Sequence, residues 1–87
     1  MIVLFHKDYD KQYKKLHNNE KRRVEERTLF FIENIFNPIL NNHPMHGRYQ
    51  GYRSINVGGD LRAIYKVMDD GVIVFVEIGT HNQLYSA

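Results

Sequence analysis

The feature that most constrains this fold is a change in the spacing of apolar residues near Leu40. Between residues 8 and 36, apolar side chains recur every three to four positions, which is typical of amphipathic helices. After Leu40 they alternate with polar residues, which is typical of strands with one buried face. A chain of 87 residues has room for one small core. We therefore predict a single α+β domain over residues 1–87.

The first half is predicted to hold an N-terminal strand over residues 1–6 and two antiparallel helices on a short connection. Asp8 can cap the first helix, and Tyr9, Tyr13 and Leu16 share one of its faces. The second helix is expected from about Glu20 until Asn37-Pro38, because the residue before a proline disfavours helical geometry. Its apolar stripe is expected to comprise Val24, Thr28, Phe31 and Ile35, widened by Leu29, Ile32 and Phe36.

The second half predicts three strands, over residues 52–57, 61–67 and 72–78, with turns at Gly58-Gly59-Asp60 and Asp70-Gly71. As a two-residue hairpin loop, Asp-Gly sets the pairing of the strands on either side. The expected pairs are Val67 with Val74, Tyr65 with Val76, and Ala63 with Ile78. The helical hairpin is then expected to pack on one face of a small, mainly antiparallel twisted sheet.

The other face of this sheet carries the candidate site. It is expected to present Tyr52, Ser54, Asn56, Arg62 and Lys66, with Ile64, Ile73, Phe75 and Glu77 among them. Arg62 lies opposite both Asn56 and Gly79 in this register, so open space is expected above the guanidinium. A one-turn helix from Thr80 places His81 and Tyr85 on the same side. The candidate catalytic residues at this edge are Asp60, Arg62, His81 and Tyr85.

These residue types suit the cleavage of RNA. A fixed arginine stabilises charge on a phosphate, an effect of roughly 10²- to 10³-fold for one donor. Histidine exchanges protons at neutral pH, and the 2′-hydroxyl of RNA supplies a nucleophile. An exposed tyrosine such as Tyr52 or Tyr85 can stack an unpaired base. This chemistry requires no metal and no small-molecule cofactor. The structural alternative is a surface ion pair between Asp60 and Arg62, with His81 as a cap.

Composition excludes several other classes. The chain has no cysteine, which rules out disulfides and thiolate chemistry, and no apolar run approaches the length of a membrane span. The apolar start MIVLF is too short for a signal peptide, so a reducing cytoplasm is expected. Residues 7–27 hold eight Lys and Arg against five Asp and Glu. This basic stretch suits a polyanion, although a solvated helix face is the alternative.

The runs HPMHG, YQGYRSINVGGDLRAIYK and IGTHNQLY, in this order behind two basic helices, resemble the RelE/ParE superfamily of bacterial type II toxins. The likeness is greatest to its YafQ-like branch and covers essentially the whole chain. It implies a small sheet-and-helix endoribonuclease that cleaves mRNA in the ribosomal A site. It also implies a cognate antitoxin that holds the enzyme inactive.

Carried over residue by residue, the resemblance assigns active-site roles to His43, Asp60, His81 and Tyr85. Arg62 matches the arginine that RelE-like members use for the scissile phosphate. Asn56 and Leu61 depart from the pattern, which has histidine and tryptophan there. We therefore assign proton transfer to His81 and His43, and we assign to Arg62 a larger part of the electrostatic stabilisation of the phosphate. The expected substrate-binding residues are Arg53, Lys66, Tyr52 and Asn56, although alternation places Arg53 on the core-facing side of its strand.

Other readings of the same residues remain open. His43 and His46 are spaced as HxxH, but their loop carries no further clustered ligands, so no metal site is expected. A ParE-type toxin would bind DNA gyrase and cleave nothing. A catalytically inactive homologue would only dock on an antitoxin or on RNA. An RNA-cleaving site requires His81 and the sheet arginine, and the other two classes do not.

Overall fold

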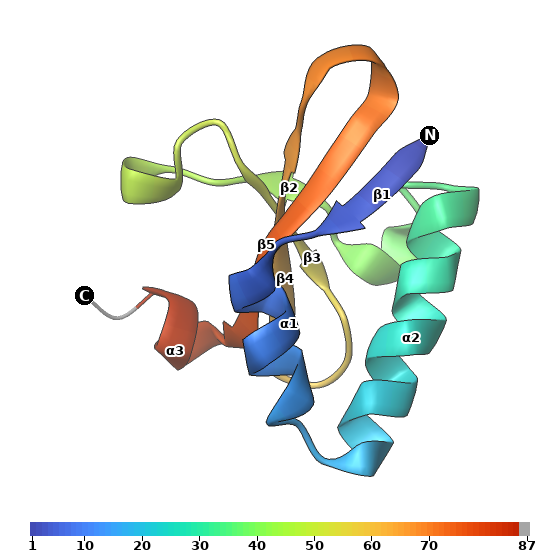
Figure 1. The fold of residues 1–87 in the computed structure, drawn as a ribbon, viewed down its shortest axis with the longest axis vertical. Coiled ribbons are helices and arrows are strands. Elements are labelled where there is room, and N and C mark those ends of the chain that lie inside the picture. The colour runs from blue at the N-terminus through green and yellow to red at the C-terminus, as the bar shows by residue number, and fades with distance from the viewer. Residues whose placement is uncertain (86–87) are drawn as a thin grey trace.

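The computed structural model describes residues 1–85. Five strands form one sheet in the order β1-β5-β4-β3-β2, with β1 parallel to β5 and the other neighbours antiparallel. Figure 1 shows two helices beside this sheet and a third, short one at the C-terminal end. The strands are β1 (Ile2–Phe5), β2 (His43–Pro44), β3 (Arg53–Asn56), β4 (Leu61–Val67) and β5 (Val72–Thr80). The helices are α1 (Lys7–Lys14), α2 (Asn18–Glu33) and α3 (His81–Tyr85), and the predicted α+β fold is confirmed.

Aromatic side chains form the core between the sheet and the first two helices. Phe31 of α2 lies edge-on to Tyr65 of β4 and Phe75 of β5, with ring centroids 4.9 and 5.2 Å apart. Tyr9 of α1 packs against the same Phe75 at 5.7 Å. All four rings are buried, and burying one large apolar side chain contributes roughly 1.5–3 kcal/mol. This core holds α1 and α2 on the same face of the sheet, as predicted.

The start of α1 differs from the prediction. His6 caps this helix, because its Nδ1 accepts a hydrogen bond from the backbone N–H of Asp8 at 3.1 Å. The predicted Asp8 cap is therefore wrong by two residues. At the start of α2, the Glu20 carboxylate accepts from the backbone N–H of His17 at 2.8 Å. That capping bond explains why α2 begins before Glu20.

The apolar pattern also places the end of α2 too far along the chain. The helix ends at Glu33, and Asn34 is already extended, with φ −157° and ψ 104°. Leu29, Ile32 and Phe36, expected to widen the buried stripe, are 64%, 46% and 60% exposed. These side chains therefore form an apolar surface instead of a wider core.

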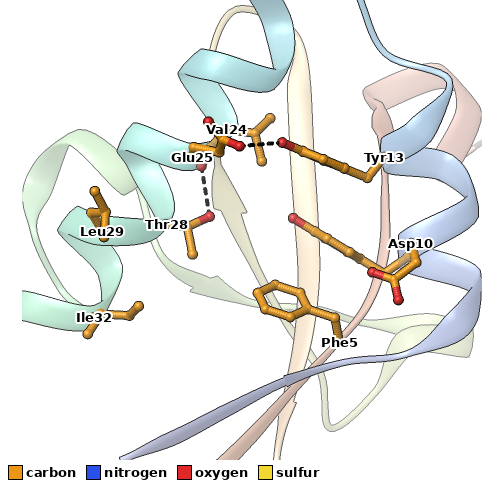
Figure 2. Close-up of a pocket in the computed structure, with 9 residues that line it drawn as sticks. Phe5, Asp10, Tyr13, Val24, Glu25, Thr28, Leu29 and Ile32 are labelled. Atoms are coloured by element: carbon orange, nitrogen blue, oxygen red, sulfur yellow. Dashed lines mark hydrogen bonds between the residues drawn. The ribbon is translucent and has the colours of Figure 1, made fainter. Parts of the chain in front are cut away.

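A groove opens between α1 and α2 (Figure 2). Its volume is about 570 Å³, and Tyr13 reaches across it to donate a hydrogen bond to the Glu25 carboxylate at 3.0 Å. Burial and this bond both raise the pKa of Tyr13. The walls are Phe5, Tyr9, Asp10 and Tyr13 on one side and Val24, Glu25, Thr28, Leu29 and Ile32 on the other.

In the hairpin of β4 and β5, the predicted register is confirmed only in the half that lies away from the turn. Arg62 faces Gly79 and Ala63 faces Ile78, but Tyr65 faces Phe75 and Val67 faces Ile73. The predicted partners of Tyr65 and Val67 are wrong because the loop is one residue longer than expected, and a bulge then restores the predicted register from Ile64 outward. The loop has three residues, Asp69–Gly71, in which Gly71 adopts φ 79°. A β-bulge beyond Ile64 then leaves one extra residue on β5.

The bulge changes which side chains of β5 face the helices. Ile73 and Phe75 were expected on the open face of the sheet and are instead buried in the core with Ile78. Phe75 and Ile78 are three positions apart, which a regular strand would send to opposite faces. The extra residue brings both to the helical side.

The second face of the sheet is covered by the segment 45–52 and by α3. Met45, Ile64 and Leu84 form a small buried cluster there. The two-residue strand β2 was not predicted, and it pairs His43 with Ser54 of β3. This pairing brings the HPMHG run to the sheet. None of the helices within residues 1–85 is long and apolar enough to cross a membrane.

Candidate active site

One cavity gathers four of the five predicted catalytic side chains. It has a volume of about 460 Å³ and lies on the face of the sheet away from α1 and α2. His43 comes from β2, Arg62 from β4, and His81 and Tyr85 from α3. The full lining, which we call the site cavity, is Asn41, His43, Pro44, Met45, His46, Arg62, His81 and Tyr85.

A capping box creates the short helix that carries His81 and Tyr85. The backbone N–H of Thr80 donates to Gln83 Oε1 at 2.8 Å, and the N–H of Gln83 donates to Thr80 Oγ1 at 3.2 Å. His81 then occupies the first position of α3 and Tyr85 the last. Their rings lie one helical turn apart, with centroids at 4.4 Å. The predicted one-turn helix and the pairing of these two residues are confirmed.

The predicted open space above Gly79 is wrong. A Cβ atom at Gly79 would lie 2.9 Å from Gln83 Oε1 and 3.4 Å from Leu84 Cδ2. The reason is that α3 turns back over the end of β5. Gly79 therefore makes room for α3, and the Arg62 guanidinium lies elsewhere.

The Arg62 guanidinium is held by two backbone carbonyl groups. Its Nη1 donates to the oxygens of Gly59 at 3.0 Å and Leu61 at 2.9 Å. Within residues 1–85 no ion pair joins Arg62 to Asp60, which removes the surface-pair alternative. A guanidinium has five N–H donors in a planar fork, so the Nη2 and Nε groups remain for a ligand in the cavity.

His43 is oriented by its own turn. Its Nδ1 lies 2.7 Å from the carbonyl oxygen of Asn41, which adopts a left-handed conformation with φ 46°. A carbonyl oxygen only accepts hydrogen bonds, so Nδ1 carries the proton. In the neutral ring the Nε2 lone pair is then free to accept another proton. This tautomer suits a general base.

Tyr85 presents its ring to the cavity but directs its hydroxyl group into the protein. The hydroxyl donates to Ser54 Oγ at 3.2 Å and approaches Met45 Sδ at 3.4 Å. Ser54 is fully buried. Sequence reasoning placed Ser54 on this face without giving it a role, and the pairing of His43 with Ser54 is the signal that was missing. Tyr85 therefore provides an aromatic wall.

Asp60 and Asn56 do not reach the site cavity. The Asp60 side chain is exposed, and its backbone oxygen accepts from the N–H of His81 at 3.3 Å. Asn56 faces Arg62 across the strands, as predicted, but its Oδ1 accepts from the N–H of Gly58 at 2.9 Å. Both residues support the turn behind Arg62, so contact with a ligand in the cavity is not favoured for either.

The other predicted substrate-binding residues also lie outside the cavity. Arg53 donates from Nε to Asn42 Oδ1 at 2.7 Å, and its guanidinium carbon lies 5.5 Å from the centre of the Phe36 ring. It thus secures the chain after α2, in agreement with its core-facing phase. The Lys66 ammonium lies 5.4 Å from the centre of the Tyr52 ring, which stabilises both side chains at a distance from the cavity.

His46 is the ionisable residue of the site cavity to which sequence reasoning gave no role. The HxxH spacing drew attention to His43 and His46 only as metal ligands, yet both line the site cavity. Among the described residues, no group of three His, Cys, Asp or Glu side chains is arranged to hold a metal. The lining includes one guanidinium and three imidazoles, and no carboxylate within residues 1–85 joins it. Such a cavity suits an anion.

The family model described as the YafQ bacterial toxin of type II toxin-antitoxin systems matches residues 2–86. The chain belongs to the YafQ toxin family. It is therefore a toxin of a type II toxin-antitoxin pair, within the RelE/ParE superfamily that its motifs resemble. A comparison with curated protein sequences gives no match.

Solved structures of YafQ and related toxins share this fold. YafQ from E. coli strain BL21(DE3) is 23% identical over 97% of each chain, with a TM-score of 0.80. A chain of the E. coli DinJ-YafQ toxin-antitoxin complex is 26% identical, with a TM-score of 0.77 over 97% of this chain and 96% of that chain. The YoeB/ParE toxin from Agrobacterium tumefaciens is 15% identical, with a TM-score of 0.76 over 93% of this chain and 99% of that chain.

Proposed function

We propose that this YafQ-family toxin is a metal-independent endoribonuclease that cleaves mRNA, with the ribosomal A site as the place of cleavage. One observation carries the proposal: His43, Arg62, His81 and Tyr85, which come from three separate elements, line a single cavity. That cavity contains a cation for a phosphate and imidazoles for proton transfer. RNA brings the nucleophile itself.

In the proposed mechanism each group has one role. His43 Nε2 takes the proton of the 2′-hydroxyl, and the 2′-oxygen attacks the adjacent phosphorus. Arg62 stabilises the charge that develops on the phosphate oxygens. The bond from phosphorus to the 5′-oxygen breaks, and protonated His81 supplies the proton to that oxygen. The products are a 2′,3′-cyclic phosphate and a 5′-hydroxyl end. General acid and base catalysis each contribute about 10²- to 10⁴-fold.

Tyr85 has a positioning role in this mechanism. Its ring lies against His81, and its hydroxyl is bonded to buried Ser54. The ring limits the movement of the imidazole and offers a face on which an unpaired base can stack.

We further propose that the cognate antitoxin binds the groove between α1 and α2. The groove is mostly apolar, and its carboxylates belong to Asp10 and Glu25 (Figure 2). The matching partner is an amphipathic segment with apolar side chains for the groove and a basic side chain for this acidic pair. The complex of the related YafQ with DinJ supports an antitoxin as the occupant. Exposed Leu29 and Ile32 would be covered on binding.

Mapping RNA ends after brief induction in cells tests the nuclease proposal. Primer extension on a reporter mRNA should show new cuts within the reading frame for the parent and none for Arg62→Ala or His81→Ala. His17→Gln is the matched control, because His17 is exposed and lies outside the site cavity. This control should cut like the parent. Growth arrest without cuts would contradict the proposal and favour gyrase inhibition.

A further inference from the structure

A second, smaller cavity adjoins the site cavity. It has a volume of about 340 Å³ and shares two wall residues, His46 and Tyr85, with the site cavity. Arg48, Tyr49 and Leu84 complete its lining. We call it the side pocket. Of its walls, the proposed cleavage mechanism uses Tyr85 alone.

The walls of the side pocket are mostly planar groups. The guanidinium carbon of Arg48 lies 5.1 Å from the centre of the Tyr49 ring, so the two groups are close enough for a cation–π contact. The imidazole of His46 and the phenol of Tyr85 contribute two further planes. Unpaired RNA bases bind to proteins by stacking on aromatic rings and on guanidinium planes.

The side pocket is also built before any ligand arrives. Arg48 Nη2 donates to the backbone oxygen of Leu84 at 2.9 Å, which ties the loop to α3. The Tyr49 hydroxyl donates to the Glu77 carboxylate of β5. Burial, followed by this bond, raises the pKa of Tyr49, so its ring is a neutral phenol at pH 7. Backbone hydrogen bonds from Tyr49 to His46 and from Tyr52 to Tyr49 close the loop.

We infer that the side pocket is a nucleobase subsite for the nucleotide next to the scissile phosphate. This inference rests on the proposed endoribonuclease activity and deepens it. With a phosphate at Arg62 and His81, an adjacent unpaired base passes Tyr85 and His46 and stacks against the wall that Arg48 and Tyr49 form together. The recognition is by stacking, so it favours bases with strong stacking and contributes to the choice of cleavage site.

Abasic substitution tests the subsite directly. Synthetic mRNAs placed on programmed ribosomes carry either natural bases or one abasic ribose at a position flanking the mapped cut. For the parent, one flanking abasic position should slow cleavage by roughly 5- to 150-fold, the loss expected when one stacked base is removed. The variant Tyr49→Ala should cut the natural mRNA more slowly and show less than about a twofold further loss for that abasic mRNA.

Two further variants serve as controls for this test. Tyr49→Phe keeps the ring and should keep the full abasic penalty. His46→Ala alters an exposed wall residue and should reduce the penalty even if Tyr49→Ala does not fold. If Tyr49→Ala and His46→Ala keep the full abasic penalty, the subsite is refuted and the endoribonuclease proposal is not. The same holds if no flanking position shows a penalty in the parent. A parent that cuts none of the mRNAs overturns the endoribonuclease proposal and the subsite with it.

Discussion

Removing the Tyr85 hydroxyl should reduce stability far more than catalysis. That hydroxyl donates to Ser54 Oγ, and Ser54 is 0% exposed, so no solvent can replace the lost partner. An unsatisfied buried hydroxyl costs about 1–3 kcal/mol, whereas removing both partners of such a bond is nearly neutral. Tyr85→Phe should therefore lower the free energy of unfolding by about 1–2 kcal/mol. In a domain of this size that corresponds to a fall in Tm of about 4–16 °C.

A double-mutant cycle isolates this interaction. Tyr85→Phe, Ser54→Ala and the double variant are compared by urea denaturation, with mRNA cleavage measured in parallel. The double variant should lose less free energy of unfolding than the sum of the two single variants, with a coupling energy of about 1 kcal/mol. Tyr13→Phe is the matched control, because its hydroxyl bonds an exposed carboxylate, and should cost much less. Additive effects would refute the bond, and a loss of cleavage of about 10²-fold or more in Tyr85→Phe would show proton donation instead.

Three further outcomes follow from the structure. Gly79→Ala should displace the Gln83 amide that caps α3 and lower the free energy of unfolding by about 0.5–2 kcal/mol. Cleavage should fall further than this loss of stability explains, as denaturation and cleavage assays on one preparation would show. Burial raises the pKa of Tyr9 well above 10, so the unfolded chain loses this proton first and stability falls as pH rises above 10. Tyr9→Phe should reduce that alkaline loss by up to about 1.4 kcal/mol per pH unit in urea titrations. Leu29→Lys in the groove should weaken antitoxin binding in calorimetry, because it removes an apolar contact and repels the proposed basic side chain, and should leave cleavage unchanged.

Local sequence rules predicted the positions that depend on short-range chemistry. The Gly58-Gly59-Asp60 turn correctly pairs Asn56 with Arg62, because the two residues flank it closely. Arg62 faces Gly79 as predicted only because the β-bulge offsets the longer loop at Asp69–Gly71. The one-turn helix expected from Thr80 brings His81 and Tyr85 together. The convergence of Arg62, His81 and Tyr85 followed from these local features.

Long-range packing decided what the sequence left undetermined. The β-bulge opposite Tyr65 lets Phe75 join the aromatic core with Phe31 and Tyr9, and no local signal marks its position. The side-chain directions at the site could not be predicted either, because they depend on partners far away in the sequence. Arg53 is drawn to Asn42, a partner eleven residues away, and Tyr85 points its hydroxyl at Ser54, thirty-one residues away.

The most direct test of the cleavage mechanism uses a synthetic mRNA with one 2′-deoxyribose at the position of the mapped cut. Purified toxin and programmed ribosomes should cut the all-ribose mRNA to a fragment with a 5′-hydroxyl end. The mRNA with the single deoxyribose should stay intact at that position, because its nucleophile is missing. Cleavage at the deoxyribose, or a 5′-phosphate end, would contradict attack by the 2′-hydroxyl and the roles of His43, Arg62 and His81.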